Sequence, residues 1–266
     1  MVNILNYQLL RGLGLSERVA QKIVPNTHLK SYLPGDVLYA RGTMEQPWRY
    51  VLAGVGCYCS PARLGARDLF SIVGPGHWVG EAPVKDSQSA AMELLCMTEM
   101  RFMEVPLEII RHTYDSDFNF CRFVARLFSD RNLRQSETAL IQRVPETADR
   151  VALYLALLCE TFLTYSSAKA AHASKKADSN QSHQSLPFNQ TVLASLCDVS
   201  RSNLSQTLKQ FALAGLCQVQ YGQVTLLQLE AWIETLKMQR SQKDCIGQGA
   251  FGTLINRSVR TRYASA

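Results

Sequence analysis

The stretch that most constrains the fold of this chain is CDVSRSNLSQTLKQFALAGL, residues 197–216. Its apolar side chains Leu204, Leu208 and Phe211 recur at the spacing of one face of an α-helix. Ser200 stands before this run, where its hydroxyl can accept a hydrogen bond from a backbone N–H of the first turn. The pattern therefore predicts a capped helix with one buried face.

A shorter helix is predicted directly upstream, with Asn189 as its cap. Only residues 197–199 separate the two helices, so the connection is a tight turn. Asp198 stands where such turns usually have glycine, and aspartate tolerates a positive φ better than most residues. Two short helices joined in this way predict a helix-turn-helix. The following run, GLCQVQYGQVTLLQLEAWIETL, predicts a wing of two strands around Tyr221-Gly222 and a closing helix.

Polar side chains of the second helix share one stripe opposite its apolar face. They are Arg201, Ser202, Ser205, Gln206 and Lys209. Arg201 suits bidentate contact with a guanine and Gln206 suits an adenine, whereas Lys209 reaches only phosphate. With Asn189 and Gln190 at the start of the first helix, these residues are the predicted DNA-binding set. A solvated helical pair would explain the stripe more simply, but the wing beside it favours double-stranded DNA as the partner.

The charge of the chain is concentrated in its later part. The sequence has 28 Lys and Arg and 22 Asp and Glu, and residues 1–164 hold 17 of each kind, so the excess of +6 lies in residues 165–266. A local surplus of this kind is typical of domains that neutralise DNA phosphates. A length of 266 residues suggests two domains. No stretch approaches the roughly 20 apolar residues of a membrane span, so we expect no membrane association.

The compartment expected from the sequence is the cytoplasm. The N-terminal residues lack a basic segment followed by an apolar one, so no secretory signal is predicted. Eight cysteines without the spacing of a disulfide framework indicate reduced thiols. Cys57 and Cys59 face one side of a strand, but two thiols without a third ligand are more often core residues. We therefore expect no metal, heme or other cofactor, and no enzyme motif argues for catalysis.

Residues 31–105 predict a small antiparallel β-roll or jelly roll. Glycines divide this segment into short β-rich runs such as RYVLAG and DLFSIVG, with turn signals at roughly 8–12-residue spacing. From Asp115 the period becomes helical, and one long helix with a broad apolar stripe is predicted. The stripe contains Phe120, Phe123, Val124, Leu127 and Phe128. Where its own β domain leaves this stripe uncovered, a second subunit is the better candidate to cover it.

The remaining segments complete the outline. Pro145 is predicted to start another helix. Residues 165–186 are rich in Ser, Ala, Lys and His, so we expect a flexible loop there. After about Met238 the chain is rich in Gly, Ser and Arg, and a poorly ordered tail is predicted.

In this order the elements resemble the Crp–Fnr family of bacterial transcription regulators. The resemblance runs from about Leu10 to Leu236 and rests on five motifs. They are YLPGDVLYARG (32–42), YVLAGVG (50–56), GPGHWVGEAP (74–83), ADRVALYLALL (148–158) and VSRSNLSQTLKQFALAGL (199–216). The family implies a homodimer that binds a near-palindromic operator, works with RNA polymerase and responds to a small-molecule signal in its β domain.

The fold class implied by this resemblance is α+β. It comprises a cyclic-nucleotide-binding-like β-roll or jelly roll (1–114), a dimerisation helix (115–144), a winged helix-turn-helix domain (145–238, with the loop 165–186) and a basic tail (239–266). The alternative is a signalling or scaffold module with a vestigial helix-turn-helix. Such a module would be expected to carry acidic or apolar residues along the 201–209 stripe, and this chain does not.

The chain matches only half of the residues with which family members hold cyclic AMP. Members that bind cyclic AMP hold the ribose with the glutamate of a Gly-Glu pair, which Gly80 and Glu81 match. They clamp the phosphate with an arginine and a serine, and at that place the chain has Ala90 and Ala91. A phosphate would lose strong charge-assisted hydrogen bonds there, so we expect an effector other than cyclic AMP.

Two further residues complete the candidate effector pocket. Gln135 and Ser136, on the long helix, stand about where the family touches the base of the nucleotide. The iron–sulfur branch of the family is excluded, because it needs three cysteine ligands near the N-terminus and the first cysteine here is Cys57.

Overall fold

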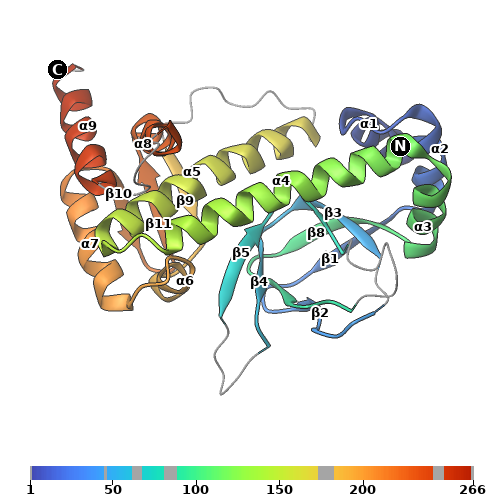
Figure 1. Cartoon of the computed structure of the whole chain (residues 1–266), viewed down its shortest axis with the longest axis horizontal. Helices are drawn as coiled ribbons and strands as arrows, with labels where there is room; N and C mark the ends of the chain where they lie inside the picture. Colours follow the sequence, from blue (N-terminus) through green and yellow to red (C-terminus); the bar gives the residue numbers. More distant parts are fainter. Residues whose placement is uncertain are drawn as a thin grey trace. The chain divides into compact units, whose positions relative to one another are not determined.

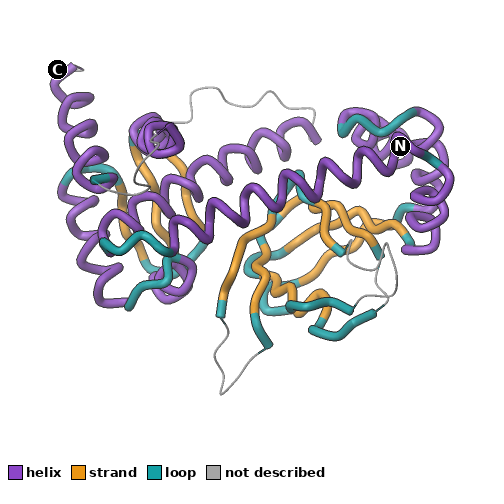
Figure 2. Tube along the Cα trace, in the orientation of Figure 1, coloured by secondary structure: helices purple, strands orange, loops and turns teal. Residues whose placement is uncertain are grey.

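The computed structural model describes residues 2–44, 47–61, 68–80, 89–172, 183–241 and 249–264. The chain divides into two compact units, Met1–Arg134 with Tyr165–Lys176, and Gln135–Thr164 with Ala177–Ala266. Helices α4 (Phe118–Gln142) and α5 (Thr147–His172) each contribute residues to both units. Figure 1 labels the elements, and Figure 2 shows the same trace by secondary structure.

Antiparallel strands form the body of the first unit, as the glycine-divided segment predicts. Their bounds are β1 (His28–Tyr32), β2 (Val37–Tyr39), β3 (Trp48–Ala53), β4 (Gly56–Cys59), β5 (Leu69–Val73), β6 (Trp78–Val79), β7 (Glu93–Cys96) and β8 (Met100–Val105). They pair in two four-stranded sheets, in the orders β1-β8-β3-β6 and β2-β7-β4-β5. At one turn glycine is required: Gly54 has a φ of +86°, and a Cβ there would lie 2.1 Å from the Glu99 carbonyl oxygen.

Two apolar clusters fill the first unit. One includes Val51, Leu94 and Phe102 from the strands. In the other, Trp48 and Trp78 stack with ring centroids 4.2 Å apart. The helices of the unit pack on this second cluster. They are α1 (Val2–Gly12), α2 (Glu17–Ile23), the short 3-10 helix η1 (Val24–Asn26), α3 (Leu107–Ser116) and the first part of α4.

The long helix α4 begins at Phe118 and not at Asp115 as predicted. Asp117 interrupts the helical path with an extended φ of −134°, and its carboxylate accepts a hydrogen bond from the Phe120 backbone N–H at 3.0 Å. Most of the predicted apolar stripe packs on the second cluster: Phe120, Phe123, Val124 and Leu127. Phe128 differs, because it is 46% exposed. Within this chain the β-roll therefore covers more of the stripe than the sequence suggested.

The second unit contains the predicted helix-turn-helix and wing. Its elements are the last part of α4, the first part of α5, β9 (His183–Leu186), α6 (Gln190–Leu196), α7 (Arg201–Leu213), β10 (Cys217–Gln220), β11 (Gln223–Leu227), α8 (Leu229–Ser241) and α9 (Ala250–Ala264). The α+β architecture, with an N-terminal β-roll, a long helix and a C-terminal winged helix-turn-helix, is thereby confirmed.

The flexible loop predicted at 165–186 is wrong at both of its ends. Helix α5 continues to His172, and the ring of its residue Tyr165 is buried beside Gly74 of the first unit. At the other end, β9 pairs antiparallel with β11. Residues 173–182, between these ends, lie outside the described part of the chain.

The prediction of a poorly ordered tail after about Met238 is also wrong. Helix α8 extends to Ser241, and α9 occupies Ala250–Ala264. Ala250 and Leu254 are fully buried, so α9 has an apolar face that packs within the second unit. No helix in the described ranges is long and apolar enough to cross a membrane.

Candidate nucleic-acid interface

The two helices of the helix-turn-helix are capped as their sequence predicts. The Asn189 side chain accepts a hydrogen bond from the Val192 N–H at 2.9 Å, and Ser200 Oγ accepts one from the Asn203 N–H at 3.2 Å. Asp198, in the turn, has a φ of +53°. This left-handed conformation is one that aspartate adopts more readily than most residues. Local sequence thus explains the start of both helices and the turn between them.

The apolar face of α7 is buried in the second unit. Leu204, Leu208 and Phe211 are at most 1% exposed, which is the apolar face the spacing predicts. Phe211 lies edge-on to Trp232 of α8, with ring centroids 5.2 Å apart. The Trp232 indole also donates a hydrogen bond to the Leu227 carbonyl at 2.9 Å, so α8 is fixed to the end of the wing. These contacts fix which face of α7 points outward.

Four of the five predicted stripe residues of α7 are exposed: Arg201, Ser202, Gln206 and Lys209. Ser205 is half-buried. The Ser202 hydroxyl lies 3.0 Å from that of Ser200, so it shares a hydrogen bond at the start of the helix. The stripe carries two positive charges and hydrogen-bonding groups at helical spacing, which are the groups that read base edges and neutralise phosphates.

The two residues predicted on α6 are placed differently from the stripe. Asn189 is exposed, but its side-chain oxygen is used for the helix cap. Gln190, in the first turn, is half-buried. A phosphate contact at this helix start would therefore use the amide group of Asn189 or the side chain of Gln190.

The wing is a three-stranded sheet in the order β10-β11-β9 (Figure 1). The predicted turn at Tyr221-Gly222 joins β10 and β11, and Tyr221 is fully exposed at its tip. Sequence reasoning missed the third strand, β9, because Gln184 stands at one of its buried positions and hides the apolar alternation. The hydroxyls of Ser185 and Thr225 lie 3.1 Å apart across the strand pair.

An ion-pair network lies beside the helix-turn-helix in the second unit. Arg240 of α8 donates to both carboxylate oxygens of Glu137, on α4, at 2.6 and 2.9 Å. It also donates to both oxygens of Glu160, on α5, at 2.8 and 2.7 Å. The hydrogen bonds to these two carboxylates raise the pKa of Arg240 further above its ordinary value. The last turns of α4 are thereby tied to α5 and α8.

The candidate effector residues are only partly described. Glu81 lies outside the described residues. Gly80 is buried with a φ of +89°, and Ala90 is buried among apolar side chains with its backbone paired to Gly42 and Thr43. Gln135 and Ser136 are exposed residues of the second unit.

A buried ion pair lies in the β-roll, at a place that sequence reasoning missed. Arg49 donates to Glu104 at 2.6 Å, and both side chains are almost completely buried. Tyr32 donates to the same carboxylate oxygen at 3.0 Å. Burial alone would raise the pKa of Glu104, but the hydrogen bond and charge of Arg49 outweigh it and lower that pKa. All three groups are satisfied by one another, which indicates a structural role.

No disulfide joins the cysteines of the described residues. Burial raises the pKa of Cys57 to about 12, with the nearby Cys59 as a second cause, so this thiol stays protonated. Across the described ranges, no group of three or more His, Cys, Asp or Glu is arranged to hold a metal ion.

Comparisons with known proteins identify the second unit by sequence. Residues 149–232 match the family model of the Crp-like helix-turn-helix domain. This range contains α6, α7, the wing and the first residues of α8, and it ends before α9. No curated protein matches the chain by sequence.

Solved structures identify the fold. A CRP/FNR-family transcriptional regulator of Thermus thermophilus is 20% identical, with a TM-score of 0.59 over 79% of this chain and 98% of its own. FixK2 of Bradyrhizobium japonicum is 14% identical, with a TM-score of 0.61 over 78% of this chain and 96% of its own.

A third similar structure is the global regulator CLP of Xanthomonas campestris, described as responsive to c-di-GMP. It is 16% identical, with a TM-score of 0.58 over 80% of this chain and 99% of its own. By sequence the chain therefore contains a Crp-like helix-turn-helix domain, and its fold is similar to that of these solved structures.

Proposed function

We propose that this protein is a homodimeric regulator of transcription that binds a specific sequence of double-stranded DNA through α7. The observation that carries the proposal is the exposed polar stripe of α7 on a helix whose opposite face is completely buried. In the proposed complex Arg201 contacts a guanine, Gln206 contacts an adenine, and Lys209 contacts phosphate. Ser202, Ser205, Asn189 and Gln190 make the remaining contacts.

The proposed dimer uses the outer face of α4. Residues of this face recur at spacings of three and four and are all exposed: Phe118, Arg122, Ala125, Ser129, Leu133, Ser136 and Leu140. Phe118, Leu133 and Leu140 are between 50% and 76% exposed, which is costly for large apolar side chains unless a partner covers them. A two-fold partner would place two α7 helices on half-sites about one turn of DNA apart.

The proposed signal is a small molecule other than cyclic AMP, sensed in the β-roll. The support is the chemistry at Ala90 and Ala91, which offers no guanidinium and no hydroxyl to a phosphate. RNA polymerase is the partner that a regulator of this kind would address on DNA. Cysteines that form no disulfide within the described ranges suit a reducing compartment such as the cytoplasm.

The test is selection of bound duplexes from a random library by the full chain, followed by titration of the selected site and its single-base variants. Arg201→Ala should cost about 1–3 kcal/mol on the selected site and flatten the preference at one base pair. Lys209→Ala is the matched control for charge: it should weaken all duplexes alike and reduce the salt slope by about one unit.

Two results would count against the proposal. If the full chain selects no sequence, the helix-turn-helix is vestigial and the protein is better regarded as a signalling or scaffold module. If Arg201→Ala leaves both affinity and base preference intact, α7 is not the helix that reads DNA.

A further inference from the structure

Helix α9 belongs to the structure of the second unit, although the matched helix-turn-helix range ends before it. Ala250 and Leu254 are fully buried. Phe251 lies against Phe211 of α7, with ring centroids 5.3 Å apart. Figure 1 shows α9 as a separate helix beyond α8 at the end of the chain. A helix with buried residues and an aromatic contact to α7 is more than a basic tail.

The start of α9 is held by a residue that lies far away in the sequence. The Asp149 carboxylate accepts hydrogen bonds from the backbone N–H groups of Gly249 at 2.9 Å and Phe251 at 2.7 Å. Asp149 also lies in the first turn of α5. A carboxylate is favourable at the N-terminal end of a helix, and this one serves two helix starts together. Since Asp149 is 7% exposed, the cap is well shielded from water.

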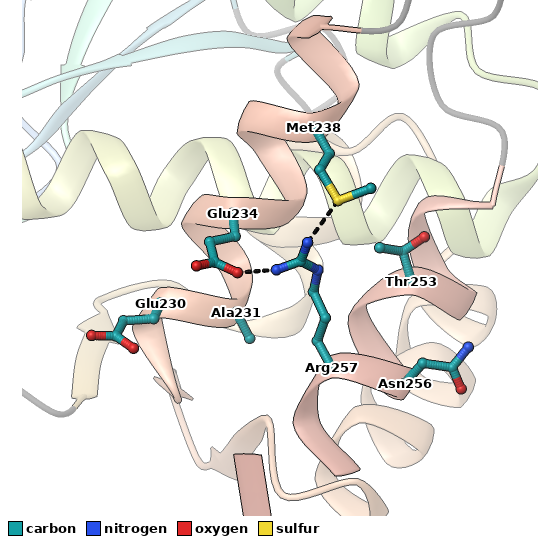
Figure 3. Close-up of a pocket in the computed structure, with 7 residues that line it drawn as sticks. All are labelled: Glu230, Ala231, Glu234, Met238, Thr253, Asn256 and Arg257. Atoms are coloured by element: carbon teal, nitrogen blue, oxygen red, sulfur yellow. Dashed lines mark hydrogen bonds and ion pairs between the residues drawn. The ribbon is translucent and has the colours of Figure 1, made fainter. Parts of the chain in front are cut away.

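A second contact ties α9 to α8. Between the two helices is a groove of about 500 Å³, lined by Glu230, Ala231, Glu234, Met238, Thr253, Asn256 and Arg257. Figure 3 shows the Arg257 side chain crossing this groove from α9. It forms an ion pair with Glu234 and approaches the Met238 sulfur at 2.8 Å. The groove is thus bridged by the protein's own side chains.

These contacts converge behind the face of α7 that points outward. Phe211 is fully buried, with Trp232 of α8 at 5.2 Å and Phe251 of α9 at 5.3 Å between ring centroids. Two aromatic contacts to one ring restrict rotation of α7 about its own axis more than one contact does. A bidentate contact between an arginine and a base tolerates little misplacement. The rotation of α7 therefore bears directly on the quality of base recognition.

We propose that α9 supports the recognition helix α7 from behind, and that Phe251 and Asp149 are positioning residues for base recognition. This inference rests on the proposed function, because it assigns a role in the DNA binding of α7. In this proposal the C-terminal segment does not contact DNA directly. It acts through Phe211, from the side of α7 opposite the polar stripe.

The experiment compares full-length variants on the selected duplex and on its variant at the Arg201 base pair. All titrations are made at a temperature where circular dichroism shows each variant folded. Phe251→Ala should reduce the preference between the two duplexes about tenfold and leave the salt slope unchanged. Phe251→Leu, which refills most of the volume, should restore most of the preference. Asp149→Asn should give a smaller loss, of about threefold, because the amide keeps one acceptor oxygen but loses the negative charge and the acceptor for the second N–H group.

Gly252→Ala provides the matched control within α9. Gly252 is exposed, and a Cβ there would meet nothing within 4 Å. Alanine favours the helix over glycine, so this variant should raise the melting temperature and keep the base preference of the wild type.

The outcomes separate a positioning role from other roles. If Phe251→Ala and Asp149→Asn lower the melting temperature but leave the base preference unchanged, α9 only stabilises the unit and the proposal is overturned. A reduced salt slope with unchanged preference would overturn it too, since it would indicate phosphate contact. If the wild-type chain itself shows no base preference, the proposed function fails, and the melting temperatures alone would still report the packing of α9.

Discussion

Gly74 is a residue whose importance appears only in three dimensions. A Cβ at this position would lie 2.3 Å from Cε2 of the Tyr165 ring, so alanine would have to displace the ring. We predict that Gly74→Ala destabilises the protein by about 1–3 kcal/mol, as overpacking of a filled core does. Urea unfolding of the full chain measures this loss. Gly12→Ala is the control, because a Cβ at Gly12 meets nothing within 4 Å; an equal loss in both variants would refute the steric argument.

His77 gives the first unit a dependence on pH. Burial, with Arg134 and Arg131 as further causes, lowers the pKa of His77 to about 4. The unfolded chain binds this proton near the ordinary pKa of about 6.5. The contribution of neutral His77 to stability is therefore fully present above about pH 6.5, and it is lost as the pH falls towards 4.

The prediction concerns the difference between the wild type and His77→Gln. Between about pH 6.5 and 4 the wild type should lose up to about 1.4 kcal/mol per pH unit relative to the variant. Urea unfolding at several pH values measures both slopes. His28→Gln, at an exposed histidine, controls for the removal of a histidine as such. Parallel curves for the wild type and His77→Gln would show that His77 does not titrate in this way.

At the scale of elements, the outer face of α4 is the surface of the proposed dimer. Leu133 is 65% exposed in the middle of this face, so Leu133→Lys should weaken dimerisation at least about tenfold by placing two charges in the seam. Sedimentation equilibrium at micromolar concentration measures this. Asn119→Lys adds the same charge off the stripe and should leave the dimer intact. A wild-type chain that is monomeric with and without DNA would exclude the dimer.

The elements that the sequence predicts well are those fixed by their own residues. Helices α6 and α7 have caps within a turn of their starts and an apolar face at regular spacing, so the pattern is local. The elements that the sequence does not predict are held by residues far away in the same chain. Tyr165 in the later part of α5 packs beside Gly74, and the start of α9 is capped by Asp149, about a hundred residues upstream. No window of sequence contains both members of such a pair.

The candidate DNA surface follows the same division. The exposed stripe of α7 could be derived from spacing alone, because one face of the helix is apolar. The residues that support α7 and the helices beside it could not be predicted from spacing. Phe251 behind α7 and Arg240 between two carboxylates make long-range contacts that come from packing. The buried pair of Arg49 and Glu104 is similar, since charged residues in a strand usually indicate an exposed face.

At the scale of the whole molecule, a fold similar to that of solved CRP/FNR-family structures carries Ala90 and Ala91 where the sequence resemblance implies a phosphate clamp. We predict that micromolar cyclic AMP produces no heat in titration calorimetry and no change in affinity for the selected duplex. The reason is the loss of charge-assisted hydrogen bonds to phosphate at Ala90 and Ala91. The same sample must bind its duplex, which controls for activity. Saturable binding of cyclic AMP would show that another group holds the phosphate.

The pairing of β9 with β11 also sets an order of events during synthesis. Leu186 pairs with Val224, so α6, α7 and β10 lie inside the loop that this pair closes. A ribosome releases β9 first, and its edge has no partner until β11 follows. Closure of so long a loop costs entropy that local helices do not lose, so the wing should form after α6 and α7. A nascent chain would therefore hold α7 in place only after the translation of residues well beyond it.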